Sequence, residues 1–289
     1  MKNEIDRMLE EIYPNKVTAT DYAPISGGCI NNAEVLSLSN GEKIFIKYHP
    51  NPPRDFFKKE AYGLNLLRQT RNGPCVPKPL CSSNPGYLLM EYIPQESPQR
   101  DYHERFGRML AEMHRETDTH YGLNHDNYIG KTAQRNTKEN DPIVFFREHR
   151  IRFQQVLARE QRLLPTDLDR QLDVLCNKLG NLLDVTNEKP ALNHGDLWSG
   201  NHFCGPKQKP YIVDPAAHFN LREADLAMME LFGSLPQGFY QAYNEVFPLN
   251  PLYKQRRNLY NLYHLLNHLN LFGESYLNSI KNIVSSYVK

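Results

Sequence analysis

The chain has 289 residues, of which 40% are apolar and 23% are charged, as is typical of a globular protein. Lys plus Arg (34) nearly balance Asp plus Glu (33), which argues against a surface for nucleic acid or for membranes, since such surfaces are usually basic. No apolar run approaches the ~18 residues of a membrane-spanning helix. The first twelve residues predict an amphipathic helix with four acids and no export signal, so we expect a cytoplasmic protein.

The cysteines point to the same compartment. Their number is odd and none forms a C-x-x-C pair, which fits reduced thiols better than a disulfide framework or a zinc site. The five are Cys29, Cys75, Cys81, Cys176 and Cys204.

The first ninety residues predict strands with one helix among them. Residues 25–38 hold a glycine pair between strand-like runs, and Asn40-Gly41 suits a tight hairpin turn into a strand over 43–48. Apolar residues at helical spacing predict a helix over 54–69, and a short apolar strand follows at 87–92.

Beyond Pro98 helical patterns dominate, interrupted by short strand-like pieces near Leu192 and at 211–213. The expected helices are 102–117, 143–164, 168–184 and 251–271. We therefore predict a bilobal α+β fold of the protein-kinase-like type. Its small β-rich nucleotide-binding lobe would span residues 1–93 and its larger helical catalytic and substrate lobe residues 94–289.

Residues 194–201, which read HGDLWSGN, carry the strongest motif. Asp196 and Asn201 lie five residues apart, and Asp214 follows thirteen residues later after an apolar triplet. This is the kinase pattern H-x-D-L-x-x-x-N followed by a metal-binding aspartate. Phosphoryl transfer explains the residue types: Asp196 would accept the proton of the attacking hydroxyl, while Asn201 and Asp214 would hold Mg²⁺ on ATP. We expect His194 to brace the loop.

The other half of a nucleotide site is predicted upstream. Lys47 ends a strand, like the lysine of V-A-I-K, and Glu60 lies in the next helix, where its partner belongs. Gly27 and Gly28 would let backbone amides approach phosphate, although they form neither G-x-G-x-x-G nor a Walker loop. The adenine is expected against the strand that enters the hinge, at Met90, Glu91, Tyr92 and Ile93.

The chain after Asp214 is too short for a protein kinase. Residues 222–226 (READL) follow within twelve residues, and no A-P-E occurs. We therefore predict a small-molecule acceptor, with no dependence on loop phosphorylation. Asp225 is expected to support the catalytic loop from a helix start.

Together these motifs resemble the fructosamine/ketosamine-3-kinase family, which is related in fold to aminoglycoside phosphotransferases. The matching stretches cover nearly the whole chain, with 192–201 and 214–233 the most specific, and include 27–31 and 121–136. The chain departs from the family at Ala217, His218 and Phe219, where aromatic residues are common, and at Asn220, where glycine is common.

The resemblance implies phosphorylation of the 3-hydroxyl of a ketosamine such as ribulosamine, erythrulosamine or fructosamine, free or as glycated lysine. Elimination of that phosphate would free the amine, which is deglycation. His218 is expected near the sugar. Trp198 would lie against the sugar or the linked amine, or pack in the core.

Cys29 raises a separate hypothesis. A thiol beside phosphate-binding amides and Lys47 would have a lowered pKa and could form a reversible disulfide that stops ATP binding. The alternative is an inert small residue. We expect a monomer or a homodimer.

Three other functions stay open. One is a small-molecule kinase for an aminoglycoside, choline or homoserine, which would share Asp196, Asn201 and Asp214. Another is a nucleotide-binding regulator without catalysis, although such proteins usually lose one of these residues. A metal hydrolase using His194 and Asp196 lacks further histidines at ligand spacing.

Overall fold

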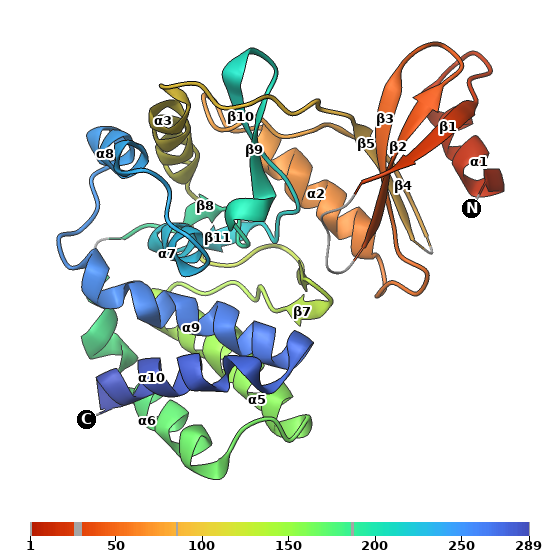
Figure 1. The fold of residues 1–289 in the computed structure, drawn as a ribbon. Coiled ribbons are helices and arrows are strands. Elements are labelled where there is room, and N and C mark those ends of the chain that lie inside the picture. Colours follow the sequence, from red (N-terminus) through yellow and green to blue (C-terminus); the bar gives the residue numbers. More distant parts are fainter. Residues whose placement is uncertain (1, 26–30, 85, 186–187, 289) are drawn as a thin grey trace.

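The computed structural model describes residues 2–25, 31–84, 86–185 and 188–288. Figure 1 shows an antiparallel sheet with two helices in the first third of the chain and a mainly helical remainder. The fold is therefore α+β, as predicted.

The sheet has the strand order β1-β2-β3-β5-β4. Gly41, at a φ of 85°, turns β2 into β3 as the Asn-Gly signal predicts. The edge strand β4 was not predicted, because it begins at a proline, and an edge is where a sheet tolerates one. The strands are β1 (Ala19–Pro24), β2 (Asn32–Leu38), β3 (Lys43–Tyr48), β4 (Pro79–Ser83) and β5 (Tyr87–Glu91).

The two faces of β3 have different roles. Successive side chains of a strand point to opposite faces. Ile44 and Ile46 pack against the apolar stripe of helix α1 (Lys2–Ile12), which covers the outer face of the sheet. Phe45 and Lys47 face the other way and line a cleft. The alternation of β3 therefore places Lys47 in the cleft.

Helix α2 (Phe56–Arg68) lies between the sheet and the helical region (Figure 1). Its buried stripe of Phe57, Leu64 and Leu67 packs in one core cluster with Leu110 and Leu226 from the helical region. Glu60 lies on the same stripe, at spacings of three and four residues, so the helix turns its carboxylate inward.

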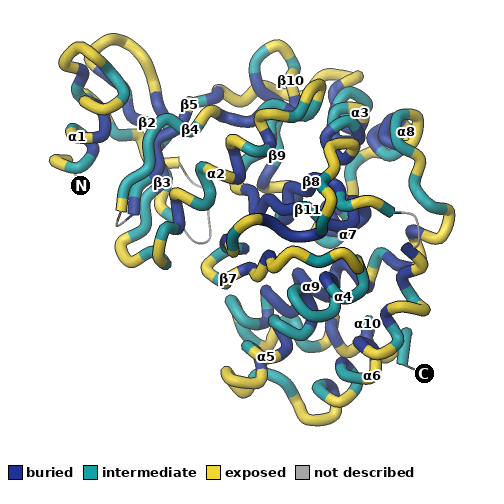
Figure 2. The backbone as a smooth tube through the Cα atoms, turned by 180° about the vertical axis from the view of Figure 1, so that it is seen from behind, coloured by how far each residue is buried: buried dark blue, intermediate teal, exposed yellow. Residues whose placement is uncertain are grey.

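The helices within residues 142–183 and 253–288 enclose a second core, whereas α3 and α8 pack in the same cluster as α2. Figure 2 shows the buried backbone concentrated around β8, β11 and α7. The helix predicted over 143–164 is three segments, because the π-helix η1 interrupts it, and α8 and α10 were not predicted. These elements are α3 (Tyr102–His114), α4 (Pro142–Phe146), η1 (Arg147–Arg152), α5 (Phe153–Glu160), α6 (Thr166–Leu183), α7 (Glu223–Leu231), α8 (Gln237–Val246), α9 (Tyr253–Phe272), η4 (Glu274–Tyr276) and α10 (Leu277–Val288).

Short antiparallel ladders carry the predicted catalytic residues. β8 pairs with β11, and β9 pairs with β10. The chain leaves β8 just before His194 and leaves β10 just before Asp214, so both loops emerge at the cleft. The strands and short helices of this part are β6 (Asn127–Ile129), β7 (Thr132–Gln134), β8 (Ala191–Asn193), η2 (Ser199–Asn201), β9 (His202–Gly205), η3 (Pro206–Gln208), β10 (Lys209–Ile212) and β11 (His218–Asn220).

Candidate active site

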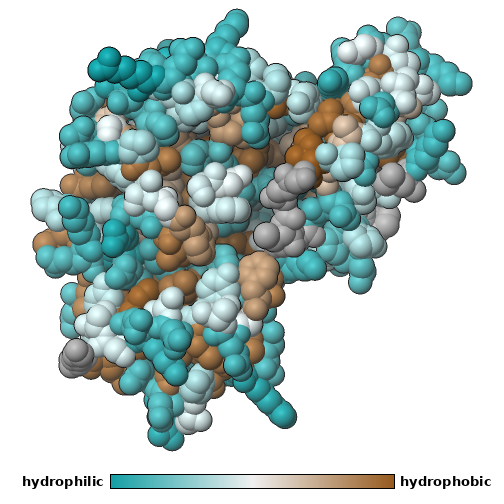
Figure 3. Space-filling model, viewed as in Figure 1, coloured by the Kyte–Doolittle hydropathy of each residue, from teal (hydrophilic) through white to brown (hydrophobic). Residues whose placement is uncertain are grey.

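A cleft of about 1110 Å³ opens between the sheet and the helical region. Figure 3 shows apolar surface where the sheet faces this hollow. Both regions line it, and it brings together the five residues that the sequence predicts for phosphoryl transfer: Lys47, Glu60, Asp196, Asn201 and Asp214.

Lys47 is the cation of the cleft. Its Nζ donates to Glu60 Oε1 and to Asp214 Oδ1, each at 2.7 Å, and its side chain is 5% exposed. Burial lowers the pKa of Lys47, but Asp214 and Glu60 outweigh burial and raise it above its usual range. Lys47 therefore stays charged, and it couples the sheet to the chain that follows β10.

Asn201 shapes the loop around Asp196. Its Nδ2 donates to the Asp196 backbone oxygen at 2.8 Å and, more weakly, to Asp196 Oδ2 at 3.3 Å. Val213 N in turn donates to Asn201 O at 3.0 Å, which ties the catalytic loop to the residue before Asp214. Because Nδ2 is used by the loop, the Asn201 Oδ1 is the atom left to face a cation.

The Asp196 carboxylate accepts one side-chain bond, the long one from Asn201 Nδ2. Burial, and then the charges of Asp214 and Asp225, raise the pKa of Asp196 to about 7, while the Asn201 bond offsets part of this. A carboxylate of that pKa can take a proton from an alcohol and release it near neutral pH, which suits a general base.

His194 and Asp225 hold the loop from below. His194 Nε2 donates to Val213 O at 2.8 Å, and the Asp196 amide donates to His194 Nδ1 at 3.3 Å. Asp225, at the start of α7, accepts from the amides of His194 (2.6 Å) and Gly195 (2.8 Å). Each of these bonds thus joins His194 or Asp225 to backbone groups in the loop or next to Asp214.

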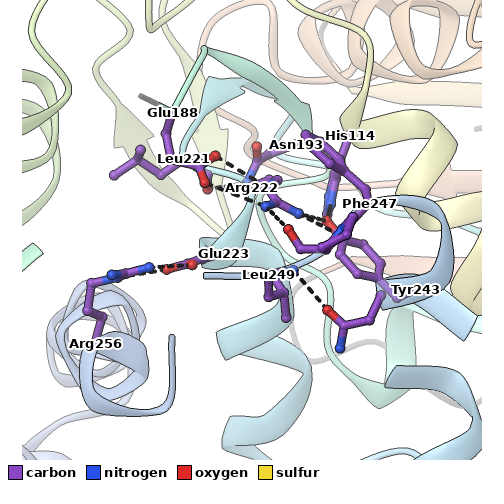
Figure 4. Close-up of polar contacts among 12 residues, drawn as sticks. His114, Glu188, Asn193, Leu221, Arg222, Glu223, Tyr243, Phe247, Leu249 and Arg256 are labelled. Atoms are coloured by element: carbon purple, nitrogen blue, oxygen red, sulfur yellow. Dashed lines mark hydrogen bonds and ion pairs between the residues drawn. The ribbon is translucent and has the colours of Figure 1, made fainter. Parts of the chain in front are cut away.

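A chain of polar groups leads from Asp225 into the core, and Figure 4 shows most of it. Arg222 Nη1 donates to Tyr243 Oη at 3.3 Å. Tyr243 Oη lies 2.8 Å from His114 Nδ1, and His114 Nε2 lies 3.3 Å from Asp225 Oδ2. The Arg222 guanidinium also lies 3.7 Å from the centre of the Phe247 ring. Residues 222–225 therefore anchor the catalytic loop.

The cleft fits a divalent cation held partly by a phosphate. Asn201 and Asp214 offer an amide oxygen and a carboxylate, hard ligands of the kind Mg²⁺ prefers, and one or two carboxylates with substrate phosphates are its usual site. Within the described ranges, no cluster of three or more His, Cys, Asp or Glu side chains could hold a metal by itself.

The predicted adenine residues Met90, Glu91, Tyr92 and Ile93 all line the cleft. So does Trp198, whose indole folds over Gly200: a Cβ added there would lie 2.4 Å from the ring. Gly27, Gly28 and Cys29 lie outside the described residues.

His218, which we expected near the sugar, lies behind the cleft instead. The side chain is 2% exposed and lies outside the cleft lining, and its Nδ1 donates to Ala216 O at 2.8 Å. The reason is register: His218 pairs with Asn193 across the β8–β11 ladder, which directs the imidazole into the core behind Gly195.

Sequence reasoning missed an aromatic wall at the far side of the cleft. It comes from the end of α7, the end of α9 and η4, and its rings lie 5.1–6.4 Å apart. Two members are 42% and 47% exposed, which is unusual for phenylalanine. The i,i+4 pair on α9 was the available signal. The wall comprises Phe232, His268, Phe272 and Tyr276.

One further property concerns the helices. In the parts of the chain that the structure covers, none is long and apolar enough to cross a membrane.

Known proteins are similar to this chain in sequence over most of their length. A protein of Synechocystis named a probable ketoamine kinase is 40% identical over 87% of this chain and 85% of its own. Protein-ribulosamine 3-kinase, chloroplastic, of Arabidopsis thaliana is 36% identical over 93% of this chain and 83% of its own.

Solved structures agree. A Thermobifida fusca protein described as a "putative fructosamine-3-kinase" superposes with a TM-score of 0.89 at 30% identity, covering 99% of both chains. An aminoglycoside phosphotransferase, APH(2'')-Ib, shares the fold alone, with a TM-score of 0.64 at 12% identity over 100% of this chain and 98% of its own. The family described as fructosamine kinase matches residues 1–289, and this chain belongs to it.

Proposed function

We propose that this protein is an ATP-dependent kinase that phosphorylates the 3-hydroxyl of ketosamines, as the resemblance in sequence implied. The observation that carries the proposal is the cleft, where Lys47 pairs with both Glu60 and Asp214 and where Asp196 has a raised pKa of about 7. Lys47 would bind the ATP phosphates, and Asp196 would accept the proton of the sugar hydroxyl. Asn201 and Asp214 would hold Mg²⁺, which neutralises charge on the transferred phosphoryl group.

The acceptor side of the cleft supports an amine-bearing sugar. A ketosamine carries a secondary amine that is cationic at neutral pH, and aromatic faces attract such a cation. The aromatic wall and Trp198 provide those faces. The names of relatives in Synechocystis and Arabidopsis also favour ketoamines over aminoglycosides.

A substrate panel tests the proposal. ATP consumption would be measured with ribulosamine-lysine, fructosamine-lysine and kanamycin, each with its unglycated or phosphorylated counterpart as control. ³¹P NMR would then locate the phosphate on the sugar. We expect turnover of at least one ketosamine, with the phosphate on O3. Turnover of kanamycin alone would replace this function with aminoglycoside phosphorylation, and ATP binding without any turnover would favour a regulator.

Loss of the 3-phosphate would then free the amine, so the physiological role would be deglycation of amines or proteins. We keep the cytoplasmic location and the monomeric or homodimeric state as predictions. The redox hypothesis for Cys29 is tested with non-reducing gels and activity under peroxide. Identical behaviour of the wild type and Cys29→Ser would remove it.

A further inference from the structure

Residues 121–136 match the family, yet nothing in the proposed chemistry uses them. They include the hairpin β6–β7, whose strands pair from Asn127 to Gln134. The hairpin belongs to the helical region, but Asn127, Tyr128, Ile129 and Gly130 line the cleft. It therefore lies close enough to the catalytic groups to act on them.

Two amides of the hairpin bind the backbone just after Asp214. Gln134 Nε2 donates to Ala216 O at 2.9 Å, and Asn127 Nδ2 donates to Ala217 O at 2.9 Å. Both side chains are almost fully buried. Asp214 itself has a φ of 59°, the left-handed conformation that L residues adopt only when their surroundings hold them. The two amides supply part of that hold.

The amides are themselves oriented by buried donors. Tyr263 Oη donates to Gln134 Oε1 at 2.8 Å, and Asn136 Nδ2 donates to Asn127 Oδ1 at 2.7 Å. Arg150 Nη2 donates to Asn136 Oδ1 at 2.9 Å. The bond from Tyr263 directs the Gln134 NH₂ group to Ala216 O, and the bond from Asn136 directs the Asn127 NH₂ group to Ala217 O. The bond from Arg150 directs the Asn136 NH₂ group to Asn127 Oδ1 in the same way.

The donor at the head of this chain is a buried cation. Arg150 is 0% exposed, and its guanidinium lies 4.5 Å from the centre of the Phe145 ring. Burial lowers the pKa of Arg150 to about 10, which still leaves it charged at neutral pH. Within the described part of the chain, the Arg150 guanidinium donates to backbone carbonyl oxygens and to the Asn136 amide oxygen, and not to a carboxylate.

The other side of the hairpin contacts α2. Tyr128 Oη donates to Arg54 O at 3.0 Å, just before the helix, and the Tyr128 ring lies 5.3 Å from that of Phe56. The helix also reaches the chain after Asp214 directly, because a Cβ added at Gly63 would lie 3.3 Å from Ala217 Cβ. The hairpin, α2 and residues 215–217 thus form a closed ring of contacts.

We propose that the hairpin β6–β7 is a built-in strut between the two regions, with Gln134 and Asn127 as positioning residues for Asp214 and Tyr128 as its contact with the Glu60-bearing helix α2. The proposal rests on the proposed function, since it assumes that Asp214 binds the metal on ATP. Protein kinases have a long segment after the metal-binding aspartate, which phosphorylation can order, and this chain is too short there to have one. The hairpin would hold Lys47, Glu60 and Asp214 together instead.

The test compares two buried glutamines. Gln134→Leu removes the donor to Ala216 O. Gln155→Leu is the matched control, because Gln155 is equally buried on α5 but donates to Asp169 (2.7 Å), outside the cleft lining. Binding of Mn²⁺ with a non-hydrolysable ATP analogue would be measured by calorimetry, and thermal unfolding in parallel. We expect Gln134→Leu to weaken metal–nucleotide binding about tenfold or more, and Gln155→Leu to leave it within about twofold at a similar loss of Tm.

A second variant with a smaller change in structure tests the proposal if Gln134→Leu fails to fold. Tyr263→Phe removes only the hydroxyl that orients Gln134, and we expect a loss of metal–nucleotide affinity of a few-fold with the ring still packed. Wild-type affinity in every soluble variant of the Gln134–Tyr263 pair would overturn the strut. Absence of binding in the wild-type protein would instead overturn the proposed function itself, so the two failures are distinguishable.

Discussion

Two aspartates beside the catalytic loop, the buried Asp225 and the partly exposed Asp196, have opposite hydrogen-bond surroundings. Behind the loop, Asp225 accepts from two backbone amides and lies beside His114. Burial alone would raise the pKa of Asp225, but these partners lower it below its usual value. In the cleft, the Asp196 carboxylate has one long bond from Asn201 and a pKa raised to about 7. A satisfied carboxylate supports structure, whereas an unsatisfied one is available for chemistry.

The ion pairs of the core and of the cleft show a similar contrast. In the core, Arg256 forms two bonds to Glu223, and Arg222 contacts Glu188 (Figure 4). In the cleft, Lys47 is shared by two carboxylates. In these examples the buried arginines are paired with carboxylates, whereas the carboxylates of the cleft outnumber its cation.

The Asp196→Asn substitution tests this contrast with the largest expected effect. An amide of the same shape cannot accept the hydroxyl proton, so we expect kcat to fall about 10²- to 10⁴-fold, the usual contribution of a general base. Affinity for Mg·ATP should stay within about twofold. Steady-state kinetics with a ketosamine and calorimetry with the nucleotide measure the two effects. An active Asp196→Asn enzyme would remove Asp196 from the mechanism.

Asp225→Asn should act on stability instead. The substitution places an NH₂ group against backbone amides that now donate to a carboxylate, and hydrogen bonds to charged groups contribute about 1.5–3 kcal/mol each. We expect a loss of about 2–4 kcal/mol in the free energy of unfolding, measured by urea titration. The matched Asp196→Asn variant should be no less stable than the wild type near neutral pH. An unchanged urea midpoint for Asp225→Asn would contradict this assignment.

The same two variants should show opposite dependence on pH, measured with EDTA present. The folded pKa of Asp225 is depressed, so its stabilising contribution is present above the unfolded value near 4 and is lost as pH falls further. The folded pKa of Asp196 is raised, so wild-type stability relative to Asp196→Asn should fall as pH rises from about 4 to about 7. Parallel pH profiles for the two pairs would refute the contrast.

The smallest effect on stability is expected at Tyr243, which lies behind Asp225 in the core. Tyr243→Phe removes the hydroxyl between Arg222 and His114 but keeps the ring. The hydroxyl makes two bonds, of which the one to His114 contributes about 1 kcal/mol and the one from the charged Arg222 about 1.5 kcal/mol or more, so the urea midpoint should fall while kcat stays unchanged. A large fall in kcat would show that support of the loop reaches further into the core than we infer.

The sequence was sufficient where a site is local or periodic. Asp196 and Asn201 lie on one loop, and the alternation of β3 together with the stripe of α2 explains why Lys47 and Glu60 meet. The bilobal α+β fold followed from the same patterns. Asp214 joins the cluster from 167 residues away, which only a known motif could foretell.

The sequence was insufficient where tertiary packing decides. The orientation of His218 depends on the register of β8 with β11, a property that no local pattern encodes. The bond from Gln134 to Ala216 spans 82 residues, and a buried glutamine resembles a surface one in sequence. The aromatic wall is assembled from three elements, α7, α9 and η4. In sequence, its rings at the ends of α7 and α9 look like ordinary core residues of a helix.

The sharing of Lys47 has a consequence for how nucleotide enters. Before ATP arrives, Asp214 occupies one side of the ammonium, and Glu60 and Asp196 add further negative charge to the same cleft. A bare triphosphate would be repelled and would also have to compete with Asp214 for Lys47. A triphosphate that brings its own divalent cation would exchange partners instead, because the phosphate would take the ammonium and Asp214 would take the cation. We therefore expect the Lys47–Asp214 ion pair to make the protein discriminate against metal-free nucleotide.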